Sequence, residues 1–250
     1  MSVAEAVAFG AWCFAVALAG GLVGLVLGNI RLPAVLLLAA SPASAGGANI
    51  AISGVAAATA SVSHLRAGRV NWRLFTWMAP PSVAGALVGG YLAGVVPDDA
   101  VLFGIGVVLV YSGVDLLRRK PKPPAAGGPD LNIRAAVVSG AVVGLLGGFV
   151  GLILGALRMP ALLRLVGEIP SRAIGTNLLV GVCVGVAGLL GHLPSAAPDL
   201  GILLVGSAAS IPGALLGARL TGRLSEEQLV KAIAVVLLIA GAAALVQALA

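Results

Sequence analysis

Long apolar segments alternate with short polar ones along the whole chain. Apolar stretches of about 18 residues or more recur, and each is long enough to cross the hydrocarbon of a bilayer as a helix. They are continuous runs of Leu, Val, Ala and Gly, whereas the strands of a membrane β-barrel alternate in polarity. The pattern predicts an all-α polytopic membrane protein with about eight membrane spans.

Composition agrees with this class. The chain is 60% hydrophobic and only 10% charged, which leaves too few polar residues to cover a soluble domain of 250 residues. The 36 glycines indicate closely packed helices, because small residues let backbones approach in lipid. The net charge of +6 does not indicate a nucleic-acid partner, since the cations lie in short loops between apolar segments.

The chain contains an internal repeat. The segment GGLVGLVLGNIRLPAVL from Gly20 resembles GGFVGLILGALRMPALL from Gly147, which lies 127 residues later (147 − 20). The segment GALVGGYL from Gly85 resembles GALLGARL from Gly213, 128 residues later (213 − 85). We therefore expect a first transmembrane repeat at 1–117, a cytoplasmic linker at 118–133 and a second repeat at 134–250.

Loop charge predicts how the repeats cross the membrane. Lys and Arg mark cytoplasmic loops, and they gather in three of the connections, at 64–73, 118–130 and 219–231. The connections 97–99 and 192–199 have no Lys or Arg and are expected outside. Equivalent loops of the two halves then lie on opposite sides, so the repeats are inverted. Both termini are expected outside.

Two short apolar pieces interrupt this regular pattern. The number of crossings between the linker and the loop at 192–199 must be odd, and the piece at 155–166 is short for a full span. We therefore expect broken, re-entrant helices at 155–166 and at the equivalent 28–40. Irregular backbone at membrane depth is tolerated where it faces protein or a water-filled cavity. Many secondary transporters place their substrate site at such breaks between inverted repeats.

Each break carries one arginine two residues before a proline. We expect Gly28 and Gly155 to precede the breaks, and the prolines to occupy the first turn of a new helix. A helix N-terminus and a guanidinium both attract anions, and the guanidinium fork matches the paired oxygens of sulfite, sulfonate, phosphate or carboxylate. The candidate substrate-binding residues are Arg31, Arg158, Gly28, Asn29, Pro33, Gly155, Pro160, Asn49, Asn177 and Thr176.

Alternatives remain open for several of these residues. Each arginine could instead snorkel from a helix end to a lipid headgroup. The matched pair Asn49 and Asn177 could donate amide hydrogen bonds to a substrate, or could cap helices and join neighbouring ones. Thr176 has the same two interpretations. His64 and His192 end their spans and are expected at the membrane interfaces.

The apolar segments lack several kinds of chemical group. Carboxylates occur only near segment ends, at Glu5, Asp115 and Glu168, so an obvious proton-coupling acid is missing. An inside-negative potential would drive a monovalent anion outward by about 2.3 kcal/mol per 100 mV, which suggests potential-driven export. Cys13 and Cys183 lie far apart in apolar segments and predict neither a disulfide nor a metal site. The sequence has no nucleophile–base set, metal cluster or phosphate loop, so we expect no enzyme and no cofactor.

Taken together, these features resemble the sulfite exporter TauE/SafE family of bacterial membrane permeases. The resemblance rests on the glycine-rich first span ending in Pro33, the loop SHLRAGRVNWRL from Ser63, GALVGGYL from Gly85, and their repetition from Gly147. It implies an inverted-repeat permease of the bacterial inner membrane that exports sulfite, sulfoacetate or related organic anions. The family usually has a run of glycines where this chain has Asn29-Ile30-Arg31.

Two other functions fit the same pattern. An anion channel would use the same cationic site without alternating access, and a non-transporting scaffold would use its small-residue faces to hold other membrane proteins. The expected partners are a small anion and the lipid bilayer, and assembly into a homo-oligomer is left open.

Overall fold

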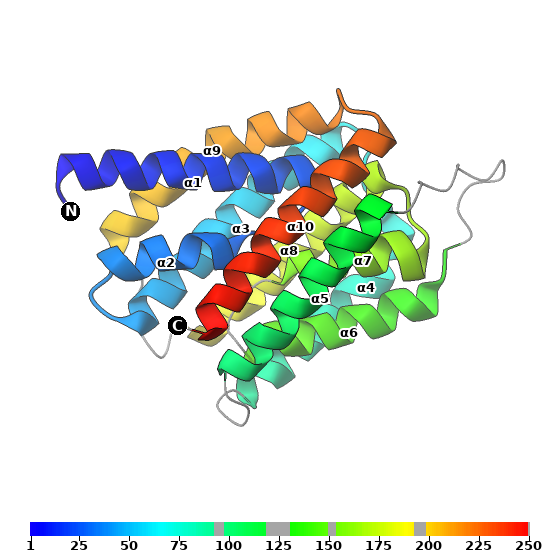
Figure 1. Ribbon diagram of the computed structural model, residues 1–250, viewed down its shortest axis with the longest axis horizontal. Coiled ribbons are helices and arrows are strands. Elements are labelled where there is room, and N and C mark those ends of the chain that lie inside the picture. The colour runs from blue at the N-terminus through cyan, green and yellow to red at the C-terminus, as the bar shows by residue number, and fades with distance from the viewer. Residues whose placement is uncertain (93–97, 119–130, 150–153, 193–198, 250) are drawn as a thin grey trace.

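A computed structural model describes residues 1–92, 98–118, 131–149, 154–192 and 199–249 (Figure 1). Within these ranges the chain is helical and has no strand, which confirms the predicted all-α class. The elements are α1 (Val3–Val23), α2 (Gly28–Leu38), α3 (Pro42–Arg66), α4 (Trp72–Tyr91), α5 (Asp98–Arg118), α6 (Ile133–Phe149), α7 (Gly155–Ala161), the π-helix η1 (Leu162–Val166), α8 (Pro170–His192), α9 (Leu200–Thr221) and α10 (Glu226–Leu249). Most of the expected linker, and most of the expected outer loops, lie outside the described residues.

Polar side chains fix where several helices begin. Ser2 accepts a hydrogen bond from the backbone of Glu5, and the Glu5 carboxylate accepts one from the Ser2 backbone, which is a complete capping box. Asn71 and Asp199 cap α4 and α9 in the same position, each accepting from a backbone N–H three residues on. These caps satisfy backbone donors that a helix start leaves free.

Six helices of the described ranges are long and apolar enough to cross a membrane. They are α1, α3, α5, α8, α9 and α10. The helices α2 and α6 are apolar but shorter, and α4 has 20 residues but is not among the six. This arrangement confirms a membrane protein with multiple spans.

Several helices pack closely against one another at glycine positions. A Cβ atom added at Gly89 on α4 would lie 2.1 Å from the Leu145 carbonyl oxygen on α6. A Cβ atom added at Gly217 on α9 would lie equally close, 2.1 Å, to the Leu18 carbonyl oxygen on α1. The two contacts are equivalent in the repeat, since 217 − 89 is 128 and 145 − 18 is 127. Glycine at these positions therefore lets the backbones of α4 and α6, and of α1 and α9, touch.

Helices α5 and α10 lie side by side across the front of the bundle (Figure 1). Their contact is also matched between the halves: Gly113 faces the Ala234 carbonyl oxygen, and Gly241 faces the Gly106 carbonyl oxygen. Helix α3 packs against both α8 and α9, and α8 packs against α4. The pairing of α3 with α9 therefore has its equivalent in the pairing of α8 with α4.

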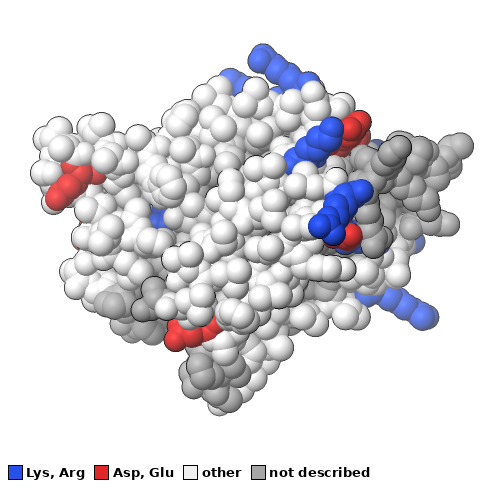
Figure 2. Space-filling model, viewed as in Figure 1, with Lys and Arg blue, Asp and Glu red and all other residues white. Residues whose placement is uncertain are grey.

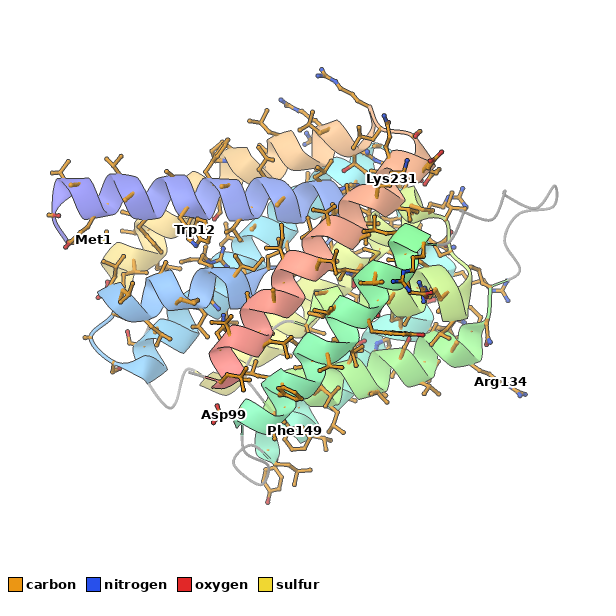
Figure 3. All side chains as sticks on the ribbon, in the orientation of Figure 1. Met1, Trp12, Asp99, Arg134, Phe149 and Lys231 are labelled. Carbon is orange, nitrogen blue, oxygen red and sulfur yellow. The ribbon has the colours of Figure 1, made fainter. Side chains whose placement is uncertain are left out.

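Most charged side chains lie at one end of the molecule. Figure 2 shows Lys and Arg gathered toward the right and upper right, and Figure 3 places Arg134 and Lys231 there, opposite Met1 and Trp12. Helix ends meet at this cationic end: Arg69 donates to the Ala218 carbonyl oxygen (3.0 Å), and Ser171 donates to the Glu226 carboxylate through both its backbone N–H (2.9 Å) and its hydroxyl (2.6 Å).

The short helices occur where they were predicted, but the break itself lies elsewhere. Helix α1 ends at Val23, Gly24 adopts a left-handed conformation (φ 71°), and α2 begins at Gly28. The non-helical stretch is therefore 24–27. We expected Gly28 and Gly155 to precede the breaks, and this was wrong. Each glycine instead begins the helix that follows a break. Glycine is required at position 24, because its φ is one that residues with a Cβ atom rarely adopt.

Candidate functional site

Both arginines of the breaks are buried inside the protein. Arg31 is the fourth residue of α2 and Arg158 the fourth residue of α7, and their exposed fractions are 2% and 1%. Arg31 Nε donates to Asn49 Oδ1 and Arg158 Nε donates to Asn177 Oδ1, both over 3.0 Å. The two guanidinium groups therefore do not snorkel to lipid headgroups. Each is held by an asparagine of the following long helix.

The same asparagines hold the backbone of the breaks. Asn49 Nδ2 donates to the Gly28 carbonyl oxygen (3.1 Å). Asn177 Nδ2 donates to the carbonyl oxygens of Gly155 (2.8 Å) and Gly24 (2.7 Å). Because Gly24 lies in the first break and Gly155 begins the helix after the second, Asn177 connects the two halves of the chain. The first break and the start of α7 therefore lie together, and each asparagine connects a short helix to its arginine.

Two small cavities lie beside the breaks. One, of about 20 Å³, is lined by Arg31 and Ser53 together with apolar residues of α1, 25–27, α3 and α8. The other, of about 10 Å³, is lined by residues of both breaks, including Val26 and Leu154, and by α5 and α10. A single water needs roughly 10–15 Å³ on this measure, so each of these two cavities holds about one water molecule.

The prolines have a different role from the one expected. Pro33 and Pro160 are the sixth residues of their helices and not first-turn residues, because the helices begin five residues earlier, at the glycines. An interior proline cannot donate to the carbonyl four residues back, which for Pro33 is that of Asn29. Gln247 Nε2 of α10 donates to this oxygen over 2.8 Å and satisfies it. Membrane helices accommodate proline in this way, because a neighbouring helix replaces the lost backbone hydrogen bond.

Asn29 and Thr176 lie apart from the arginine contacts. Asn29 Nδ2 donates to the Ala240 carbonyl oxygen (3.1 Å), so this side chain joins α2 to α10. Thr176 Oγ1 accepts from the Asn71 backbone N–H (2.9 Å). Asn71 also donates through its side chain to the Glu168 carboxylate, and Glu168 is 3% exposed. Thr176 therefore belongs to a polar contact between α8 and the start of α4.

His64 lies in the last turn of α3, and its position at a membrane interface stays a prediction. Its side chain is fully buried, and its Nε2 lies 3.2 Å from the Gly21 carbonyl oxygen of α1. Gly21 also packs directly on the α9 backbone, so His64 fills a junction of α1, α3 and α9. The side chain of His192 lies outside the described residues. Trp12, Trp72 and Trp77 are about half exposed, at 43%, 58% and 55%, as expected of side chains that face lipid.

Sequence reasoning missed two residues that contact the site. Ser53 Oγ accepts from Arg31 Nη2, and Gln247 supports the Asn29 carbonyl. A sequence signal existed for Ser53, which follows Asn49 by four residues and therefore shares its helix face. No local signal identified Gln247, because its contact joins residues that are 218 positions apart. The described residues contain no group of three or more His, Cys, Asp or Glu side chains that could hold a metal ion.

Loss of Asn177 is expected to destabilise the protein more than loss of Asn49. Asn177→Ala removes hydrogen bonds to Arg158, Gly24 and Gly155, whereas after Asn49→Ala the Arg31 guanidinium still donates to Ser53. We expect the free energy of unfolding to fall by about 2 kcal/mol more for Asn177→Ala, since a buried charged donor loses its acceptor. Thermal unfolding of both variants in one detergent measures the difference, and an equal or larger loss for Asn49→Ala would contradict it.

Comparison with known proteins gives two kinds of match. The model of the family described as "Sulfite exporter TauE/SafE" matches residues 9–244. A protein of Xylella fastidiosa (strain Temecula1 / ATCC 700964), called a probable membrane transporter protein, is 30% identical over 224 residues, which are 84% of this chain and 85% of the relative. A protein of strain 9a5c with the same description is 31% identical over 194 residues, 72% of this chain and 73% of the relative. No solved structure matches the chain.

The family match begins within α1, ends within α10, and covers every described helix between them and both arginines. The two relatives are each matched over more than two thirds of their length. Both findings agree with the resemblance seen in the sequence. The chain therefore belongs to the sulfite exporter TauE/SafE family of membrane transporters.

Proposed function

We propose that this protein exports a small anion, such as sulfite or an organosulfonate, through a cationic site where the two helix breaks meet. The observation that carries the proposal is the matched burial of Arg31 and Arg158, each on a short helix and each held by an asparagine. Buried charge inside a membrane is costly and usually functional. A guanidinium offers a planar fork of donors that suits the paired oxygens of a sulfur oxyanion.

The same proposal includes two inverted repeats. The matched contacts of α4 with α6 and α1 with α9 support a twofold relation between the halves. The six long apolar helices together with α4 and α6 would make eight crossings of the inner membrane, with α2 and α7–η1 as short return segments after α1 and α6. The cationic end would face the cytoplasm, which puts both termini outside. The boundaries at 117 and 134 lie one residue inside the end of α5, at Arg118, and the start of α6, at Ile133.

Transport would require the site to open. The cavities of about 20 and 10 Å³ have room for roughly a water molecule each, and sulfite has four heavy atoms. Neither of these two cavities is a continuously open pore. Movement of the broken helices relative to α3 and α8 would give access in turn to each side, as in other transporters with discontinuous helices. This favours a transporter over an anion channel.

The membrane potential is the proposed driving force. Two carboxylates of the central helices and their connections are engaged elsewhere: Asp115 forms an ion pair with Arg164, and Glu168 accepts from Asn71. Neither is hydrogen-bonded to Arg31 or Arg158 in the described part of the chain. An inside-negative potential would then move the anion outward without a proton, by about 2.3 kcal/mol per charge at 100 mV.

Flux from proteoliposomes tests the proposal. Vesicles are loaded with sulfite, sulfoacetate, thiosulfate, sulfate or acetate at one pH, and a potassium gradient with valinomycin sets the potential. We expect saturable efflux of at least one sulfur oxyanion, with a rate that rises as the interior becomes more negative. Flux that follows only a pH gradient would contradict the coupling. Absence of flux for every anion, with correctly folded protein, would contradict the function and would favour a scaffold.

A further inference from the structure

The two arginines are matched in sequence but differ in their hydrogen bonds. Besides its bond to Asn49 Oδ1, Arg31 donates through Nη2 to the Asn49 carbonyl oxygen (3.3 Å) and to Ser53 Oγ. Arg158 Nη2 is buried and has no hydrogen-bond partner among the described residues. Among the described residues, the Arg158 guanidinium is hydrogen-bonded through Nε alone, to Asn177. The Nη2 atom of Arg31 is therefore satisfied by the protein, while Nη2 of Arg158 is a buried donor with no acceptor in the described ranges.

A single sequence difference explains part of this contrast. Asn49 and Ser53 are four residues apart on α3, so both side chains lie on the face that meets Arg31. The equivalent pair on α8 is Asn177 and Gly181, because 181 − 53 and 177 − 49 are both 128. Gly181 is buried and has no side chain to offer an acceptor. The first half supplies an internal hydroxyl where the second half supplies none.

A buried charged donor without an acceptor is costly, and proteins rarely keep one without a reason. An oxyanion bound at this place would supply the acceptor and the opposite charge together. The site also adjoins the joint between the two halves, because Asn177 donates to Gly24 and Gly155 as well as accepting from Arg158. An anion held there would be positioned to affect both breaks.

We infer that the two arginines have different roles. Arg158 makes the direct contact with the transported oxyanion, whereas Arg31 is a positioning residue that fixes α2 to α3. The inference rests on the proposed function and deepens it. It predicts an asymmetric site in which specificity is set from the second half of the chain. The ligand class is a small sulfur oxyanion whose oxygen replaces the missing Ser53 equivalent.

A serine at position 181 tests the inference. Gly181→Ser places a hydroxyl one turn from Asn177, where it can accept from Arg158 Nη2 as Ser53 does from Arg31. Gly181→Ala adds bulk without an acceptor, and Val182→Thr adds a hydroxyl about 100° further around the helix. The measurements are the KM for sulfite efflux, or for the screened anion with the highest wild-type flux, and the melting temperature of each variant.

We expect Gly181→Ser to raise KM at least about tenfold above that of Gly181→Ala, because the substrate must now compete with an internal acceptor. Its melting temperature should be at least that of Gly181→Ala, and Val182→Thr should keep the wild-type KM. Equal KM values for the serine and alanine variants would overturn the inference and leave the proposed function standing. If the wild-type protein moves none of the anions, the proposed function fails and the inference fails with it.

Discussion

Arg158→Ala is expected to lower transport kcat/KM by about 100-fold or more, which corresponds to roughly 2.7 kcal/mol. The substitution removes a guanidinium that is 1% exposed and that keeps a buried donor free of protein partners in the described ranges. The anion would then lose both the charge and the hydrogen bond of this side chain. Initial efflux rates over a range of sulfite concentrations give the value.

Two further variants separate binding from folding. Arg158→Lys keeps the charge but cannot keep the planar fork, so we expect an intermediate loss. Arg31→Ala removes a guanidinium whose Nε and Nη2 bond to Asn49 and Ser53, and we expect its main effect in the melting temperature. Wild-type kinetics for Arg158→Ala in folded protein would show that this arginine does not contact the substrate.

Gly89→Ala is expected to lower the free energy of unfolding by about 3 kcal/mol, the upper part of the usual range for overpacking. The added methyl group would lie 2.1 Å from the Leu145 carbonyl oxygen, a backbone atom that can move away only if α4 and α6 separate. Yield of monodisperse protein and thermal unfolding in detergent measure the effect. Gly217→Ala should behave alike in the second half, where the Leu18 carbonyl oxygen is equally close.

The neighbouring residue provides a matched control. A methyl group added at Gly90 meets no atom within 4 Å, although the position is on the same helix and in the same turn. Gly90→Ala should therefore leave the unfolding temperature unchanged or raise it slightly, since alanine favours the helix. Equal stability of Gly89→Ala and Gly90→Ala would show that α4 and α6 do not pack as closely as described.

The sequence predicted the parts of the molecule that local pattern controls. Helix class follows from the length of the apolar runs, and the short helices α2 and α7 follow from apolar pieces too short for a full span. From the sequence we could predict only that these two arginines and two asparagines belong to one site. The hydrogen bonds of Arg31 with Asn49, and of Arg158 with Asn177, could not be predicted. The repeat itself indicated which residues belong together, because each pair recurs at nearly the same offset.

Contacts between distant segments could not be predicted in this way. The helix start at Gly28 was misplaced because proline was assumed to mark a first turn, while Gln247 makes an interior proline tolerable from 214 residues away (247 − 33). The burial of His64 against the Gly21 carbonyl oxygen of α1 could not be predicted, because this contact joins residues 43 positions apart. The difference between Ser53 and Gly181 was visible in the sequence. Its effect on the hydrogen bonds of the arginines became clear only when the structure located Arg158 Nη2.

Selenite, a heavier analogue of sulfite, offers the most direct measurement. Crystals or lipid-embedded particles of the protein would be prepared with selenite, and the selenium would be located by anomalous diffraction or difference density. A peak within hydrogen-bond range of the buried Arg158 guanidinium, beside the joint made by Asn177, is the expected result. Selenium found only near exposed arginines such as Arg66 and Arg219, with no peak near Arg158 at a selenite concentration that saturates transport, would contradict a shared anion site inside the bilayer.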